Sequence, residues 1–77
     1  MNELCSTREM VERIKDIISR RIGRKKVFDW HVAVALDIGQ STLASMIKRD
    51  SPPLREILLF CSKELVDPLR ITIKKNC

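Results

Sequence analysis

Apolar residues between positions 7 and 22 recur at the three- and four-residue intervals of one face of an α-helix. Ser6 followed by Glu9 fits a capping box, and Gly23 can end a helix in the left-handed conformation because it has no Cβ. The pattern therefore predicts a first helix from about Thr7 to Arg21. The residues of its apolar stripe are Met10, Val11, Ile14, Ile17, Ile18 and Ile22.

The segment DWHVAVAL, residues 29–36, fits either a short helix or a short strand. No strand of similar quality lies nearby to pair with it, so we favour the helix, with Asp29 as its cap. Its predicted inward face consists of Val32, Ala33 and Leu36.

A third helix is predicted over QSTLASMIKR, residues 40–49, with Leu43, Met46 and Ile47 on its inner side. Its other side is small, polar and positively charged at the end. The residues of that outer side are Gln40, Ser41, Ala44, Ser45 and Lys48.

The last third of the chain contains two pairs of a cap residue and a proline. Ser51 before Pro52 predicts the start of a fourth helix that runs to about Glu64. Asp67 before Pro68 is a second pair of this kind and would start a short fifth helix. The following LRITI alternates apolar and polar residues like a strand, so an extended arm fits as well. We expect the fourth helix to bury Leu54, Ile57, Leu58, Cys61 and Leu65, with Phe60 at the edge of the stripe.

Length and composition favour one small all-α domain of four or five helices over residues 1–77. The net charge of +5 is concentrated in residues 1–26, which carry +4, and its densest run is RRIGRKK at 20–26. Such a surface attracts nucleic acid or acidic lipid, and it is equally typical of a solvated face. We expect Phe28 and Phe60 in the core, and Trp30 as a packing residue at the start of the second helix rather than a platform for stacked bases.

Cys5, Cys61 and Cys77 are odd in number and contain no CxxC pair, so they predict neither a disulfide framework nor a zinc site. The single histidine, His31, is expected on a partly exposed helix position rather than at a metal. Neither a signal-peptide run nor an apolar stretch of membrane-spanning length is present in the 77 residues. We expect a cytoplasmic protein that uses no cofactor and has no enzymatic activity, because no nucleophile, base and oxyanion set can be assembled.

Two short helices joined by a tight turn, the second with a polar outer side, are the parts of a helix-turn-helix. DWHVAVALDIGQSTLASMIKR, residues 29–49, resembles the lambda-repressor-like helix-turn-helix. QSTLASMIKRDSPPLREILLFC resembles the N-terminal DNA-binding domain of phage CI-type repressors. In that pattern Ala33 is the small residue that faces the second helix, and Ile38 follows the turn. The chain departs from it where Asp37 replaces the usual glycine, where Gly39 replaces a frequent serine, and where Met46 replaces a tryptophan.

The resemblance implies sequence-specific binding of double-stranded DNA by a prokaryotic or phage transcriptional regulator of the repressor type, associated with the nucleoid. A major groove admits an α-helix, and short polar side chains can read base edges there. The expected base-reading residues are Gln40, Ser41, Thr42 and Ser45. The expected backbone contacts are Lys48, Arg49, Arg24, Lys25 and Lys26.

One recognition helix reads only a few base pairs, so a homodimer on a pseudo-palindromic operator is expected, with half-sites about 34 Å apart. Residues 67–77 are the candidate dimerisation segment or a linker to a further domain, with Leu69, Ile71 and Ile73 as its apolar contacts. The alternative function is a small helical module that binds a partner protein and no DNA.

Overall fold

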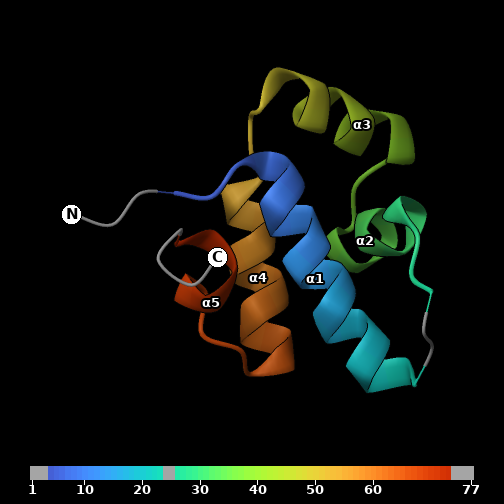
Figure 1. Cartoon of the computed structure of the whole chain (residues 1–77), viewed down its shortest axis with the longest axis vertical. Coiled ribbons are helices and arrows are strands. Elements are labelled where there is room, and N and C mark those ends of the chain that lie inside the picture. Colours follow the sequence, from blue (N-terminus) through green and yellow to red (C-terminus); the bar gives the residue numbers. More distant parts are fainter. Residues whose placement is uncertain (1–3, 24–25, 74–77) are drawn as a thin grey trace.

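The computed structural model describes residues 4–23 and 26–73, and within those ranges the chain folds into five helices (Figure 1). The prediction of a compact all-α domain of four or five helices is confirmed. The helices are α1 (Thr7–Ile22), α2 (Asp29–Leu36), α3 (Gln40–Arg49), α4 (Leu54–Glu64) and α5 (Leu69–Thr72).

α1 begins and ends where its sequence predicts, with one of the two hydrogen bonds of the expected capping box. The Ser6 hydroxyl accepts a hydrogen bond of 3.1 Å from the backbone N–H of Glu9, and Gly23 closes the helix with a φ of 70°. These two residues satisfy groups that a helix end leaves unpaired. The inner face of α1 forms the centre of the core, where Met10, Val11 and Ile14 are at most 1% exposed.

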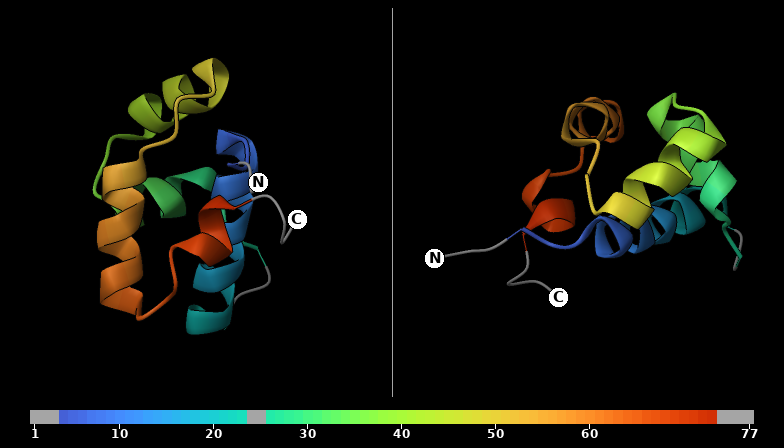
Figure 2. Two further views of the ribbon diagram at one scale, coloured as in Figure 1. Left: turned by 90° about the vertical axis from the view of Figure 1, so that its left-hand side faces the viewer. Right: turned by 90° about the horizontal axis from the view of Figure 1, so that it is seen from above.

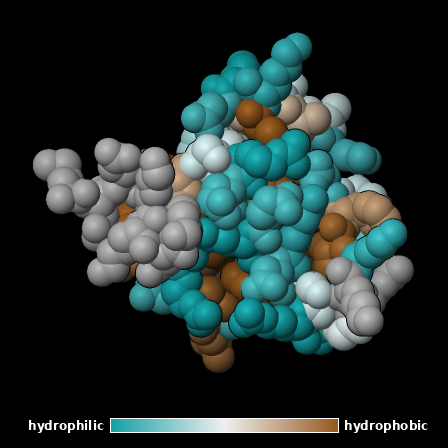
Figure 3. All heavy atoms as spheres, in the orientation of Figure 1, coloured by the Kyte–Doolittle hydropathy of each residue, from teal (hydrophilic) through white to brown (hydrophobic). Residues whose placement is uncertain are grey.

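The helices pack around that face of α1. α1 and α4 run in roughly the same direction on opposite sides of the domain, and α2 and α5 lie between them (Figure 2). α2 packs against α1, α3 and α4, while α3 lies at the top of the molecule and touches only α2 and α1 closely (Figure 1). In this orientation the visible surface is mostly hydrophilic, with apolar side chains in small separate patches (Figure 3).

The start of α2 differs from the prediction. Asp29 is the first residue of the helix rather than its cap, and the cap position is taken by Phe28. The imidazole Nδ1 of His31 accepts the backbone N–H of the cap residue Phe28 at 3.0 Å, whereas a capping carboxylate would have accepted an N–H of the first turn. Phe28 is 52% exposed, so its predicted place in the core is wrong.

α4 begins at Leu54, two residues later than Ser51 and Pro52 predict, and it presents a different face to the core. Its buried residues are Ile57, Phe60 and Cys61. The predicted burial of Leu54, Leu58 and Leu65 is wrong, since these side chains are 39%, 54% and 93% exposed. Phe60 lies in the core, as expected, and not at the edge of the stripe.

The C-terminal segment combines the two alternatives that its sequence leaves open. The Asp67 carboxylate accepts the N–H of Leu69 at 3.0 Å and starts the short helix α5, after which Ile73 pairs with Leu4 in an antiparallel bridge. Ile71 is fully buried in the domain's own core, so it is not available for the dimer contact expected of it.

Candidate nucleic-acid interface

α3 is attached to the body by few apolar contacts. Leu43 is 1% exposed and packs in the core, whereas Met46 and Ile47, on the same side of the helix, are only partly buried. The inner side predicted for this helix is therefore confirmed. One deeply buried side chain and two partly buried ones hold a ten-residue helix on α2 and α1.

The outer side of α3 is open to solvent along its whole length. The four expected base-reading residues, Gln40, Ser41, Thr42 and Ser45, are all exposed, and so is Ala44 between them. α3 contains no acidic residue, and Lys48 and Arg49 in its last turn are exposed as well. The helix thus presents short polar side chains at its N-terminal end and two cations at its C-terminal end.

The turn between α2 and α3 sets the angle at which α3 stands on the body. Asp37 adopts a φ of 59°, the left-handed conformation expected where glycine is usual, and the N–H of Ile38 bonds the carbonyl of Ala33 at 2.9 Å. Ala33 is buried, as a small residue under the second helix must be. Gly39 has an ordinary φ of −70° at the start of α3 and offers no side chain to cap it.

The acidic residues at the two ends of this unit have partners within the domain. The Asp50 carboxylate accepts the N–H of Thr7 at 2.8 Å, which ties the end of α3 to the start of α1. This hydrogen bond lowers the pKa of Asp50. Asp29 contacts the Lys15 ammonium at 2.6 Å. Burial lowers the pKa of Lys15, but the hydrogen bonds and charges of Asp29 and Glu12 outweigh it, so that the Lys15 pKa is raised.

The expected backbone contacts are not all brought together. Lys48 and Arg49 lie on α3, but Lys26 lies on the loop between α1 and α2, where it is exposed. Arg24 and Lys25 lie outside the described residues.

A groove beside Gln40 contains residues that the sequence analysis did not place at the interface. It is lined by Arg8, Lys15, Phe28, Asp29, Trp30 and Gln40. Trp30 packs on the ring of His31, as the packing role expected of it requires, but it is also 47% exposed. Helical spacing could have predicted this exposure, because Trp30 lies outside the stripe of Val32, Ala33 and Leu36.

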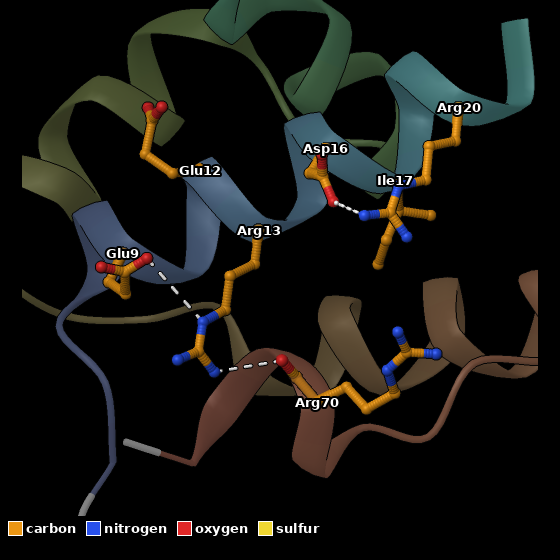
Figure 4. Close-up of a pocket in the computed structure, with 7 residues that line it drawn as sticks. All are labelled: Glu9, Glu12, Arg13, Asp16, Ile17, Arg20 and Arg70. Carbon is orange, nitrogen blue, oxygen red and sulfur yellow. Dashed lines mark hydrogen bonds and ion pairs between the residues drawn. The ribbon is translucent and has the colours of Figure 1, made fainter. Parts of the chain in front are cut away.

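A second depression lies between α1 and α5, and no residue of α3 lines it (Figure 4). Four of the charged side chains that line it form two ion pairs: Arg13 with Glu9 at 3.8 Å, and Arg20 with Asp16 at 3.1 Å. Arg13 also donates a hydrogen bond of 3.0 Å to the carbonyl of Arg70. Since these groups bind one another, this depression holds α5 on α1 and is not the better candidate for a ligand site.

Residues 4–23 and 26–73 offer little support for a metal site or for a membrane-spanning helix. Within these ranges no three His, Cys, Asp or Glu side chains are grouped so that they could hold a metal ion, and no helix is long and apolar enough to cross a membrane. The side chains of Cys5 and Cys61 are buried, and burial raises the pKa of the Cys61 thiol.

Comparison with known protein-family models, with curated protein sequences and with solved structures gave no match to this chain. The class that the coordinates define is a small all-α domain with one polar, acid-free helix exposed at its end.

Proposed function

We propose that this domain binds double-stranded DNA in a sequence-specific manner through α3 and acts as a transcriptional regulator, of the repressor type that the sequence resembles. The observation that carries the proposal is the exposure of Gln40, Ser41 and Ser45 on a helix without a single acidic residue. Had these side chains been packed inside the domain, no base edge could reach them.

The size and chemistry of this face suit a major groove. A groove about 12 Å wide admits one α-helix, and the small side chains Ser41, Ala44 and Ser45 allow the backbone of α3 to approach the bases. In this position Gln40 can pair bidentately with the N6 and N7 atoms of adenine. Lys48 and Arg49 can bind phosphates and thereby set the register of the helix without reading sequence.

The matched acidic residues support the proposal further. A carboxylate that faced the phosphates would weaken binding, but Asp50 is engaged with the start of α1 and Asp29 with Lys15. Their charge is thus partly compensated within the domain. A chain with a net charge of +5 retains a favourable electrostatic attraction to DNA.

We propose that the working unit is a homodimer, because one such helix contacts only a few base pairs. Of the three apolar residues expected to form the contact, Ile71 belongs to the core, whereas Leu69 is 56% exposed and remains available. A pseudo-palindromic operator with half-sites about 34 Å apart follows from this arrangement.

Selection of the 77-residue chain against a pool of random duplexes tests the proposal directly. Enrichment of a palindrome, or of one short half-site, is the expected result, and its spacing reports the number of subunits. Recovery of unrelated sequences would show that α3 reads no bases.

The competing function is a protein-interaction module, and the observation that favours it is the group of exposed leucines Leu58, Leu59 and Leu65. The salt dependence of binding separates the two. The affinity for DNA falls with a log–log slope of about −0.9 for each phosphate contact, whereas an apolar protein contact responds far less.

A further inference from the structure

The aromatic rings at the start of α2 form an exposed stack. The indole of Trp30 lies on the imidazole of His31 with ring centroids 3.8 Å apart and an angle of 22° between the planes. The ring of Phe28 lies on the same imidazole at 6.0 Å. The hydrogen bond from the Phe28 N–H to Nδ1 of His31 holds the imidazole in place. Trp30 is therefore supported by the rings beneath it although it is 47% exposed.

This stack adjoins the N-terminal end of the proposed recognition helix, because Trp30 and Gln40 line the same groove. A DNA strand whose base is reached by Gln40 must pass along this groove or its rim. The indole offers it a flat apolar surface, which suits the carbon face of a deoxyribose.

Two cationic side chains line the groove, and they differ in how closely they contact acidic side chains. The Lys15 ammonium contacts the Asp29 carboxylate at 2.6 Å. The Arg8 guanidinium lies 3.7 Å from Asp29 and 3.8 Å from Glu12, distances too long for a good hydrogen bond, and its side chain is 56% exposed. Arg8 can therefore turn to a phosphate at little cost, while Lys15 neutralises Asp29 and reduces its repulsion of the strand.

We infer that Trp30 and Arg8 hold the DNA strand next to the base that Gln40 reads. The indole packs against one deoxyribose and the guanidinium binds the adjoining phosphate. This inference rests on the proposed function, and it assigns to the domain a second contact region outside α3. Both residues act as positioning residues, because neither touches the base edge.

Fluorescence of the full chain tests the indole contact, since Trp30 is the single tryptophan. On titration with the selected duplex we expect the emission to change in step with complex formation measured by anisotropy. In the complex, quenching of the emission by acrylamide should fall. If a complex forms while emission and quenching stay as in the free protein, the inference is wrong.

Variants test the energetic contribution of each residue. Trp30→Ala should weaken binding about tenfold, the loss that corresponds to about 1.4 kcal/mol. Arg8→Gln should weaken binding to all duplexes alike and make the log–log salt slope shallower by about 0.9. Leu59→Ala and Lys63→Ala, exposed positions of matched character on α4, are the controls and should leave both quantities unchanged.

Folding of each variant is checked by urea unfolding. The ion pairs of Arg8 are exposed and contribute little to stability, so Arg8→Gln should fold normally. Trp30→Phe is the second variant at its position, since it keeps a ring on His31 and should retain more affinity than Trp30→Ala.

The two proposals fail in different ways. If the wild-type chain selects no duplex sequence, the proposed function fails. If it selects one and depends on Gln40, but Trp30→Ala and Arg8→Gln bind with wild-type affinity and salt slope, this inference alone is overturned.

Discussion

α3 and α4 are of similar length, ten and eleven residues, yet they use their two sides in opposite ways. α4 buries Ile57, Phe60 and Cys61 and still leaves leucines on its outer side. α3 buries one residue, Leu43, and its outer side is polar. α3 is therefore attached to the body through fewer buried side chains than α4, and its exposed side carries no large apolar residue that would compete with a polar partner.

The largest effect is expected at the residue that anchors α3. Leu43→Ala removes its only fully buried side chain and should lower the free energy of unfolding by about 3 kcal/mol, the usual loss for a core leucine. Urea unfolding followed by circular dichroism measures this. Leu59→Ala on α4 is the control, and with 58% exposure it should change stability by less than about 0.5 kcal/mol. Equal losses at the two positions would mean that α3 is not anchored through Leu43.

The outer side of α3 is tested through binding rather than stability. Gln40→Ala should lower affinity for the selected operator by about 1–3 kcal/mol and relax the preference at one base. Lys48→Ala should instead weaken binding to all sequences alike. An unchanged preference in Gln40→Ala would remove this residue from the reading set, and a loss confined to one operator position would show that Lys48 reads a base. Lys63→Ala on α4 should leave binding unchanged.

The junction of α3 with α1 depends on Asp50. Asp50→Ala removes the acceptor for the Thr7 N–H and places alanine at a φ of 53°, so we expect a lower melting temperature at neutral pH. Asp50→Asn should lose less, because asparagine keeps an acceptor oxygen and tolerates this conformation.

The pH dependence of this contribution has a definite sign. The pKa of Asp50 is lowered in the folded protein by the hydrogen bond from Thr7. Its contribution is therefore complete above the unfolded value of about 3.9 and is lost as the pH falls through the folded pKa. Melting temperatures from pH 7 down to pH 2 should converge for wild type and Asp50→Asn, and a constant difference would show that the charge of Asp50 has no part in it.

The end of α4 offers a stabilising change. Leu65 has a φ of 56° and is 93% exposed, so a leucine is strained there and buries nothing. Leu65→Gly should raise the free energy of unfolding by about 1 kcal/mol, because glycine adopts the left-handed conformation without a steric cost. Thermal unfolding measures the gain. Lower stability of the glycine variant would show that Leu65 makes an apolar contact that the exposed fraction does not reveal.

The exposure of Leu65 is also one of the features that the sequence did not predict. Helical spacing correctly predicts most residues of the inner faces of α1, α2 and α3, although Ile22, which it places in the stripe of α1, is 45% exposed. α4 has apolar residues on more than one side, so its sequence fits several stripes, and only its packing in the folded domain, where α2 contacts it, selects the one that contains Ile57 and Phe60. When a helix has two apolar sides, its packing against the other helices decides which side faces the core, and its own sequence does not.

The candidate site likewise has one part that the sequence predicts and one part that it does not. The exposure of Gln40, Ser41, Thr42 and Ser45 follows from the periodicity of α3 alone. The groove with Arg8 and Trp30 does not, since it joins α1, α2 and α3, and residues distant in sequence meet there only once the helices are packed. The ion pair of Asp29 with Lys15 likewise joins α2 to α1 and is not visible in the sequence of α2.

The smallest effect is expected at the start of α3. Gly39 has the backbone conformation of a helix cap but no side chain, and a Cβ there would lie 3.5 Å from the Thr42 hydroxyl, an ordinary contact. Gly39→Ser should therefore fit, accept the Thr42 N–H and raise the free energy of unfolding by a few tenths of a kcal/mol. Thermal unfolding of Gly39→Ser beside Gly39→Ala separates the capping hydroxyl from the loss of backbone freedom, since only serine supplies an acceptor. If both variants were equally stable, the first turn of α3 would gain nothing from a cap, and its amides would be as well satisfied by water as by a side chain.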